Sequence, residues 1–286
     1  MGAVVLALCS AVCFGSLAVT INYALRRVPD PELGAFATVL VAMVPVGLGA
    51  VGRLDWSSEV WPYFLAGLIA PGCSQIAYVV AVRDAGSART ALLVGTAPLV
   101  SVTIALAGFG EPFSVPLLLG AVLIVLGGVA LARERVRPET FRRVGLLLAF
   151  ASAAFFATRD NLVRRFATDT NVSPELAGMA TLVAGAAVIA LYLMARRGRR
   201  GPVAGLEPAL VAFAPSGFVW GLSYVFLFEA FARGRVSIVS PLVAIESLVG
   251  VVLATVVLGR SELVGRDLWI GAALIVVGGV LIGAFR

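Results

Sequence analysis

Residues 120–131 read GAVLIVLGGVAL, and residues 271–282 read GAALIVVGGVLI. Eight of these twelve positions are identical, and the two copies lie about half a chain apart. The similarity extends outward, because Pro31-Glu32-Leu33 recurs as Pro174-Glu175-Leu176, and an Ala-Thr pair follows both at the same spacing. A repeat of this length is much longer than a solenoid module and has the size of half a transporter.

The duplication predicts two structural units in the chain. The first covers residues 1–135 and the second covers residues 144–286, with a basic linker at 136–143. We expect each unit to be a five-helix repeat, because five apolar runs fall in each half.

The composition indicates that lipid covers much of the protein. Of the 286 residues, 60% are hydrophobic and 13% are charged, whereas about a quarter are charged in an average soluble domain. The net charge of +6 comes from arginines grouped between apolar runs, a pattern that fits a membrane protein better than a nucleic-acid-binding protein. We therefore predict a multi-pass protein of the cell (inner) membrane, with the lipid bilayer as a partner and no nucleic acid.

Ten apolar runs are each close to the ~20 residues that a helix needs to cross a bilayer. An odd number of spans per half turns the second half upside down relative to the first, which gives an inverted repeat. The fold class predicted is all-α integral membrane, with ten transmembrane helices arranged as two inverted five-helix repeats around a central cavity. The runs are 3–25, 33–52, 60–82, 88–108, 114–132, 144–166, 175–195, 206–230, 236–258 and 267–285.

The sequence contains little that would support enzymatic chemistry. It has no His, which removes the commonest metal ligand and general base. Its three cysteines, Cys9, Cys13 and Cys73, lie within apolar runs and show neither zinc spacing nor a disulfide framework. We expect no catalytic residues, no metal and no cofactor, and we predict that the protein is not an enzyme.

Ionisable residues within the spans give the sharpest functional signal. Glu246 lies about halfway along the ninth run, and Arg159, Asp160 and Asn161 lie inside the sixth. Such groups are costly in hydrocarbon and usually mark a substrate or ion pathway. Arg159 and Glu246 are predicted at comparable depth, so we hypothesise an ion pair or a shared polar site between them. A purely structural pair is the alternative.

Other polar side chains on the spans are candidates to line a substrate site. Trp220 is expected near mid-membrane, where its N–H needs a partner. The alternative for this group is helix–helix contact through polar residues. The candidates are Ser16, Gln75, Tyr78, Trp220 and Tyr224.

Two prolines at related positions interrupt the third and eighth runs. Pro71 and Pro215 each remove a backbone donor and free a carbonyl one turn earlier. They are read either as hinges beside a central site or as kinks without a function.

The segments 95–113 (GTAPLVSVTIALAGFGEPF) and 240–259 (SPLVAIESLVGVVLATVVLG), each followed by the Gly-rich stretch quoted first, resemble the drug/metabolite transporter superfamily of the EamA type. The resemblance covers nearly the whole chain. Gly110-Glu111 matches a Gly-Glu pair common in the family, whereas Arg260 stands after Gly259 in the second half. The resemblance implies a basket of helices with the fifth and tenth spans at the periphery, and export or exchange of small metabolites.

The function predicted is a secondary transporter that exports or exchanges small metabolites, such as amino acids, by alternating access. A multidrug exporter of cationic aromatic compounds is the main alternative, and a membrane enzyme or scaffold is a remote one. Proton coupling through Glu246 is a further hypothesis. The arginine distribution favours termini outside the cytoplasm and the family pattern favours the reverse, so orientation stays open, as do substrate, coupling ion, resting state and the choice between monomer and homodimer.

Overall fold

The computed structural model describes residues 2–50, 58–109, 114–134, 137, 141–198, 205–233, 242–243 and 245–285. These residues form helices, and none of them lies in a strand. The first half contains α1 (Ala3–Arg27), α2 (Pro31–Gly49), η1 (Ser58–Val60), α3 (Trp61–Gly67), η2 (Leu68–Cys73), α4 (Ser74–Ala85), α5 (Ser87–Val94), α6 (Ala97–Phe109) and α7 (Val115–Arg133). The second contains α8 (Arg143–Asp169), α9 (Pro174–Arg197), α10 (Leu206–Arg233), α12 (Glu246–Leu253), η4 (Ala254–Leu258), η5 (Gly259–Ser261) and α13 (Arg266–Phe285).

Seven of the apolar runs form helical segments long and apolar enough to cross a membrane. Two further helices, Val115–Leu131 and Glu246–Leu258, are apolar but shorter. The run predicted at 88–108 is divided, because α5 ends at Val94 and α6 begins at Ala97. Residues 236–241 and 244 of the ninth run lie outside the described residues.

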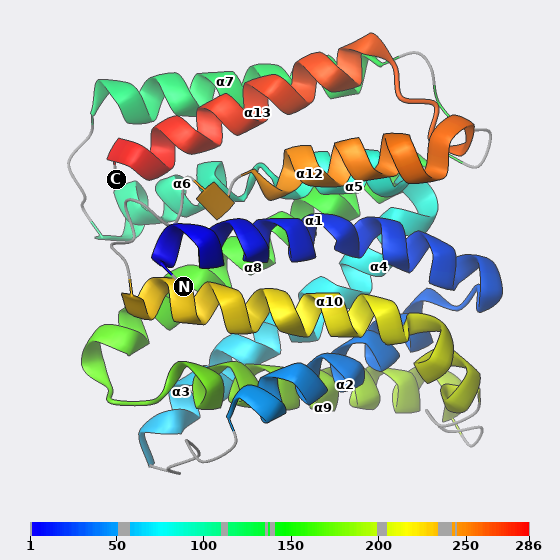
Figure 1. Cartoon of the computed structure of the whole chain (residues 1–286), viewed down its shortest axis with the longest axis vertical. Coiled ribbons are helices and arrows are strands. Elements are labelled where there is room, and N and C mark those ends of the chain that lie inside the picture. The colour runs from blue at the N-terminus through cyan, green and yellow to red at the C-terminus, as the bar shows by residue number, and fades with distance from the viewer. Residues whose placement is uncertain are drawn as a thin grey trace.

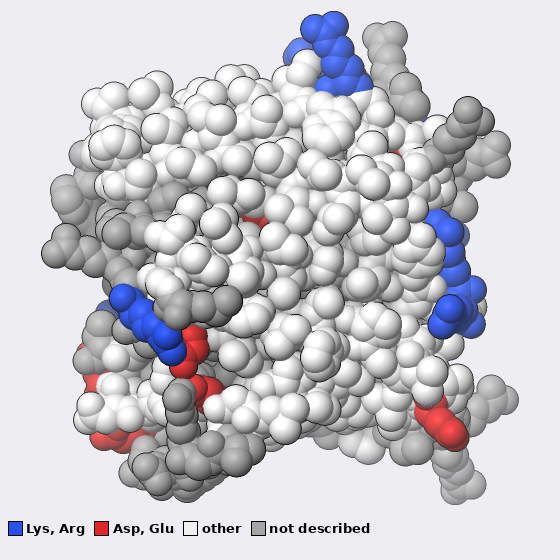
Figure 2. Space-filling model, in the orientation of Figure 1, with Lys and Arg blue, Asp and Glu red and all other residues white. Residues whose placement is uncertain are grey.

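The segments run back and forth between two ends of the molecule (Figure 1). The chain begins at Ala3 and α13 finishes at Phe285 on the same side, which we call the terminal end. Helices α1 and α4 finish on the opposite side, at Arg27 and Ala85, which we call the distal end. Figure 2 shows an almost uncharged face between these two ends, with charged side chains gathered at the margins.

Large apolar side chains point outward from the helices. Leu147 is 71% exposed, Val211 70% and Val256 75%, although each lies within a helix. Exposed apolar residues in such numbers are unfavourable in water and favourable in lipid. The outward surface therefore fits the membrane location that the composition indicates.

The second helix of each half begins in the same way. Asp30 precedes Pro31 and accepts a hydrogen bond from the Leu33 N–H at 3.0 Å. Ser173 precedes Pro174 and accepts one from the Leu176 N–H at 3.3 Å. A side-chain acceptor at the N-cap followed by proline satisfies the first turn locally. The repeated Pro-Glu-Leu motif thus marks equivalent helix starts.

The two Gly-rich stretches, residues 120–131 and 271–282, pack against each other. A Cβ on Gly120 would lie 2.7 Å from the Gly278 carbonyl oxygen, and one on Gly278 would lie 2.5 Å from the Gly120 carbonyl oxygen. Only glycine permits this approach of two backbones, which is a common way to join helices in lipid. Helices α7 and α13 therefore pair at one edge of the molecule (Figure 1), as the resemblance implied.

The core lies between the helices of the two halves. Helix α10 packs on α1 and α2, α4 packs on α8, and α9 packs on α2 and on η2. The largest cluster of buried apolar side chains contains residues of all these helices, among them Leu17, Val39, Tyr78, Leu182 and Trp220. This packing brings residues from distant parts of the sequence to the middle of the bundle.

Candidate functional site

A charged group lies at the centre of the bundle around Arg159 of α8. This side chain is 4% exposed, and its Nε lies 2.7 Å from Oδ1 of Asp160. Its Nη1 also donates a hydrogen bond to the hydroxyl of Tyr224 on α10. At 1.5 Å per residue, Arg159 is about 15 Å from the C-terminal end of α8, well inside the span. A buried guanidinium at this depth requires such partners.

Aromatic rings surround this cation. Its guanidinium carbon lies 4.9 Å from the ring centre of Tyr224 and 5.7 Å from that of Phe156. Phe14, Tyr78 and Phe156 form an edge-to-face trio with centroid separations of 5.8–6.3 Å. Trp220 packs edge-on against Tyr224 at 5.5 Å. We call these five aromatic residues the aromatic frame; both halves of the chain contribute to it.

Glu246 approaches the same site as the first residue of α12. It is half-buried, and it lies close enough to Arg159, Asp160 and Tyr78 for electrostatic interaction with each. Within the described residues, however, the ion pair of Arg159 is with Asp160 rather than with Glu246. The Asp160 carboxylate contacts Nε of this guanidinium, and the Tyr224 hydroxyl accepts from Nη1. The arrangement is therefore a shared polar site rather than a direct Arg159–Glu246 pair.

Asp160 is the member of the charged group that the rest of the protein leaves uncovered. The Asp160 side chain is 51% exposed although its neighbour Arg159 is buried. Asn161 points elsewhere, because its Nδ2 donates to Ser101 Oγ on α6 at 2.7 Å and to the Ala157 carbonyl at 2.8 Å. Asn161 thus links α8 to α6, and Asp160 is the exposed member of the three predicted residues.

Two of the predicted lining residues carry buried polar atoms without a partner in the described part of the chain. Gln75 is fully buried, and neither its amide oxygen nor its amide nitrogen is hydrogen-bonded there. The indole N–H of Trp220 likewise has no hydrogen-bond partner among the described residues, and the Trp220 side chain is fully buried. A buried polar group without a partner costs about 1–3 kcal/mol, so such groups call for an explanation such as a polar ligand.

Ser16 is not brought into hydrogen-bonding contact with this site. Its hydroxyl donates to the Cys13 carbonyl at 2.7 Å, within α1. Thr20, one turn further along α1, likewise bonds to carbonyls of its own helix. These hydroxyls bond to carbonyls of their own helix, whereas the Phe14 ring contacts Tyr78 and Phe156, and Gly15 packs against the Glu246 backbone.

The two predicted hinge prolines behave differently. At Pro71 the helix is interrupted, since Ala70 has the extended angles φ −143° and ψ 120° between α3 and α4. At Pro215 the helix is not interrupted, and α10 continues from Leu206 to Arg233. A proline removes one helical hydrogen bond without necessarily ending the helix. The backbone geometry of a hinge is present at Pro71 alone of the two.

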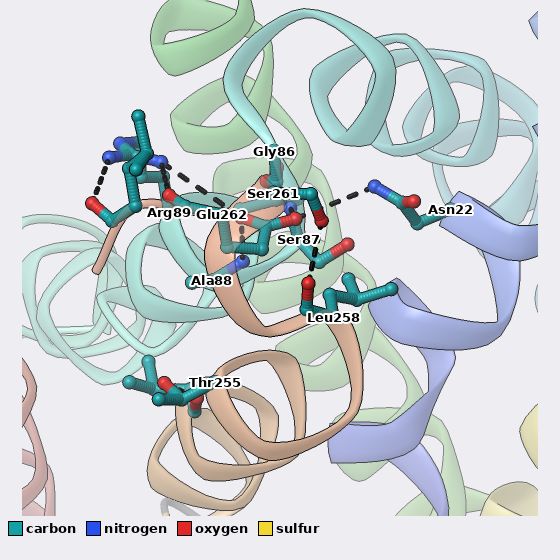
Figure 3. A network of polar contacts seen from close by, with 12 residues as sticks. Asn22, Gly86, Ser87, Ala88, Arg89, Thr255, Leu258, Ser261 and Glu262 are labelled. Atoms are coloured by element: carbon teal, nitrogen blue, oxygen red, sulfur yellow. Dashed lines mark hydrogen bonds and ion pairs between the residues drawn. The ribbon is translucent and has the colours of Figure 1, made fainter. Parts of the chain in front are cut away.

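A second polar group, which sequence reasoning missed, lies at the distal end (Figure 3). It joins Arg89 of α5, Glu134 after α7 and Glu262 before α13. One signal could have found Glu262: it stands nine residues before Gly271, just as Glu111 stands nine residues before Gly120. The residue of the second half that corresponds to Glu111 is therefore Glu262, whereas the sequence comparison had aligned Glu111 with Arg260.

Comparison with known proteins identifies the family. The sequence model of the EamA-like transporter family matches residues 1–133 and again residues 143–284. The chain belongs to the EamA-like transporter family. Members of this family are membrane transporters of small molecules, so the protein is a multi-pass membrane protein of that class.

Solved structures share the fold of this EamA-like transporter. One crystal structure has a chain 22% identical in sequence, with a TM-score of 0.64. The match covers 98% of this chain and 95% of the other. A comparison with curated proteins gave no match.

Proposed function

We propose that the protein is a secondary transporter that exports or exchanges small metabolites, such as amino acids, by alternating access. The observation that carries this proposal is the Arg159–Asp160 pair inside the aromatic frame, with Asp160 exposed and Glu246 beside it. An amino acid has one group of each charge, and the site offers a counterpart to both. Its side chain would lie against the aromatic rings.

The architecture proposed is ten transmembrane helices in the inner (cell) membrane, as two inverted five-helix repeats around a central cavity. The repeats are residues 1–135 and 144–286, joined by the linker 136–143. Two observations support it. Helices α1 and α8, the first of each half, run in opposite directions between the two ends (Figure 1). The second helix of each half also has the same capped start.

The proposed roles follow from the contacts. Arg159 binds a substrate carboxylate, and Asp160 and Glu246 bind a cationic group. Tyr224 orients Arg159, while Tyr78 and Trp220 shape the apolar part of the site. Gln75 and the Trp220 indole N–H supply hydrogen bonds to the substrate, which would give their buried polar atoms partners.

Export of cationic aromatic compounds is the second candidate, and one observation favours it. The site has two acidic side chains, Asp160 and Glu246, against one basic side chain, Arg159, and aromatic rings surround them. An aromatic cation would be attracted by the exposed Asp160 carboxylate and by the rings. Proton coupling through Glu246 is compatible with either candidate, because a carboxyl beside the site can exchange a proton when substrate leaves. A transport rate independent of pH, under a fixed substrate gradient, would contradict that coupling.

The test is uptake of a panel of labelled amino acids into proteoliposomes, comparing wild type with Glu246→Gln. Glu207→Gln is the matched control, since Glu207 is an exposed acid in the first turn of α10. We expect saturable flux of a few amino acids that is lost in Glu246→Gln and kept in Glu207→Gln. Flux that survives Glu246→Gln would remove Glu246 from the binding site. Absence of amino-acid flux, with uptake of an aromatic cation, would favour the second candidate.

A further inference from the structure

Three buried charged side chains meet at the distal end, and Figure 3 shows the part of this network around Arg89 and Glu262. Arg89 forms a two-pronged ion pair with Glu134, with Nε–Oε2 at 2.7 Å and Nη2–Oε1 at 2.9 Å. Its Nη1 also donates to the backbone carbonyl of Glu262 at 2.9 Å. The side chains of Arg89, Glu134 and Glu262 are 0%, 1% and 3% exposed.

The carboxylate of Glu262 caps the start of α5. Its Oε1 accepts a hydrogen bond from the Ser87 N–H at 2.8 Å, and its Oε2 accepts one from the Ala88 N–H at 3.2 Å. The preceding residue, Gly86, has φ +92°, and a Cβ there would lie 2.7 Å from Oε2. Glycine is therefore required both by the backbone angle and by the approach of the carboxylate. Asn22 of α1 adds a hydrogen bond to Oε1 at 3.4 Å.

This network crosses from one half of the chain to the other. Arg89 and Glu134 belong to the first half, whereas Glu262 and the Leu263 carbonyl, which accepts from Arg89 Nη2 at 3.3 Å, belong to the second. If the halves part here, Arg89 keeps Glu134 as its counter-ion, and Glu262 passes into water. Separation therefore leaves no unpaired buried cation, which would otherwise make it prohibitively costly.

We propose that Arg89, Glu134 and Glu262 form a latch that holds the distal end closed while the central site is accessible through Asp160, and that this latch must open for release on the distal side. The inference rests on the proposed function, since it assigns the closed side of the alternating-access cycle.

The latch has no counterpart of the same chemistry in the duplicated half. Arg89 stands three residues after Gly86, whereas Ser237 stands three residues after the matching Gly234. The matching glutamate, Glu111, is retained. At this aligned position the arginine of the latch is thus a feature of the first half's sequence alone.

The experiment measures how fast a reagent in water labels a cysteine at a buried position next to Arg89. Thr90 follows Arg89, is fully buried, and donates to the Gly86 carbonyl at 2.7 Å. Thr90→Cys is introduced after Cys9, Cys13 and Cys73 are changed to Ser. The full-length protein in detergent is then labelled with a charged maleimide, so neither transport nor membrane orientation enters the result.

The latch is removed with the double variant Arg89→Met/Glu134→Met, which removes the cation and one of its two carboxylates and leaves Glu262 bonded to the Ser87 and Ala88 N–H groups. We expect Thr90→Cys to label about tenfold faster or more, because each lost charged hydrogen bond is worth about that factor. The control is Glu229→Met/Arg233→Met, which removes an i,i+4 ion pair of 2.7 Å on α10. That control should not change the labelling rate.

An unchanged labelling rate in a double variant that elutes as a folded protein overturns the proposal. If the double variant does not fold, Glu262→Gln takes its place, because it keeps the Arg89–Glu134 pair and weakens the cap on α5 and the 3.9 Å ion pair between Arg89 Nη1 and Glu262 Oε2. A folded Glu262→Gln with unchanged labelling overturns the proposal equally. Faster labelling in a protein that moves no solute would support the opening motion while contradicting the proposed transport function.

Discussion

Arg159 donates a hydrogen bond to the hydroxyl of Tyr224, so α8 and α10 are joined at a buried cation in the middle of the bundle. The same guanidinium is paired with Asp160, whose side chain is about half exposed. One side chain thus connects the interior of the protein with the accessible part of the candidate site. Substitutions of the residues around Arg159 can therefore distinguish a role in substrate binding from a role in packing.

Tyr224→Phe removes the hydroxyl and keeps the ring that packs on Trp220. A hydrogen bond to a charged group is worth about 1.5–3 kcal/mol, so the KM for transport should rise about tenfold or more. Tyr192→Phe is the control, because the Tyr192 hydroxyl also meets a charged group, Glu32 at 2.9 Å, but at the exposed end of α9. Equal KM changes in the two variants would show that Tyr224 does not orient the binding group.

Gln75→Leu should raise stability and lower transport. Removing a buried polar group without a partner relieves a cost of about 1–3 kcal/mol, whereas the substrate loses its hydrogen bonds. Thr38→Val is the comparison, because the buried Thr38 hydroxyl already donates to the Gly34 carbonyl at 2.7 Å. Thermal unfolding and initial transport rates measure both effects. A Gln75→Leu protein that is less stable than wild type would indicate an ordinary packing role.

Gly127→Val should destabilise the pair formed by α7 and α13, whereas Gly128→Val should not. A Cβ on Gly127 would lie 2.8 Å from the Gly271 carbonyl oxygen, while one on Gly128 has no atom within 4 Å. Overpacking costs about 1–3 kcal/mol, which a thermal-unfolding comparison of the two variants can resolve. Similar unfolding temperatures would mean that the glycines do not set the distance between the helices.

The helices could be predicted closely from the sequence because apolar runs of membrane length leave few alternatives. The run predicted at 175–195 is α9, Pro174–Arg197, and the run at 267–285 is α13, Arg266–Phe285. The family predicted from the sequence is also confirmed by the match to the family model. It could be predicted because the packing glycines keep their spacing in both halves of the chain. The break between α5 and α6 was not predicted, since an apolar run shows composition and not backbone geometry.

Residues of the candidate site could be predicted from the sequence, but the contacts between them could not. Arg159 and Glu246 were selected because ionisable groups are costly in lipid, and Tyr224 was selected as a polar side chain on a span. The structure brings Arg159 into contact with Tyr224 and within electrostatic reach of Glu246. Their partners depend on helix rotation, which a sequence does not give; Asp160 therefore replaces Glu246 as the partner of Arg159. Glu262 was missed because it lies in a polar turn, where a charged residue is expected and draws no notice.

The caps of α2 and α9 have a consequence for synthesis. Asp30 and Ser173 each bond to an N–H three residues ahead, so neither helix start depends on the other half. Both helices can therefore begin as they leave the ribosome and enter the translocation channel.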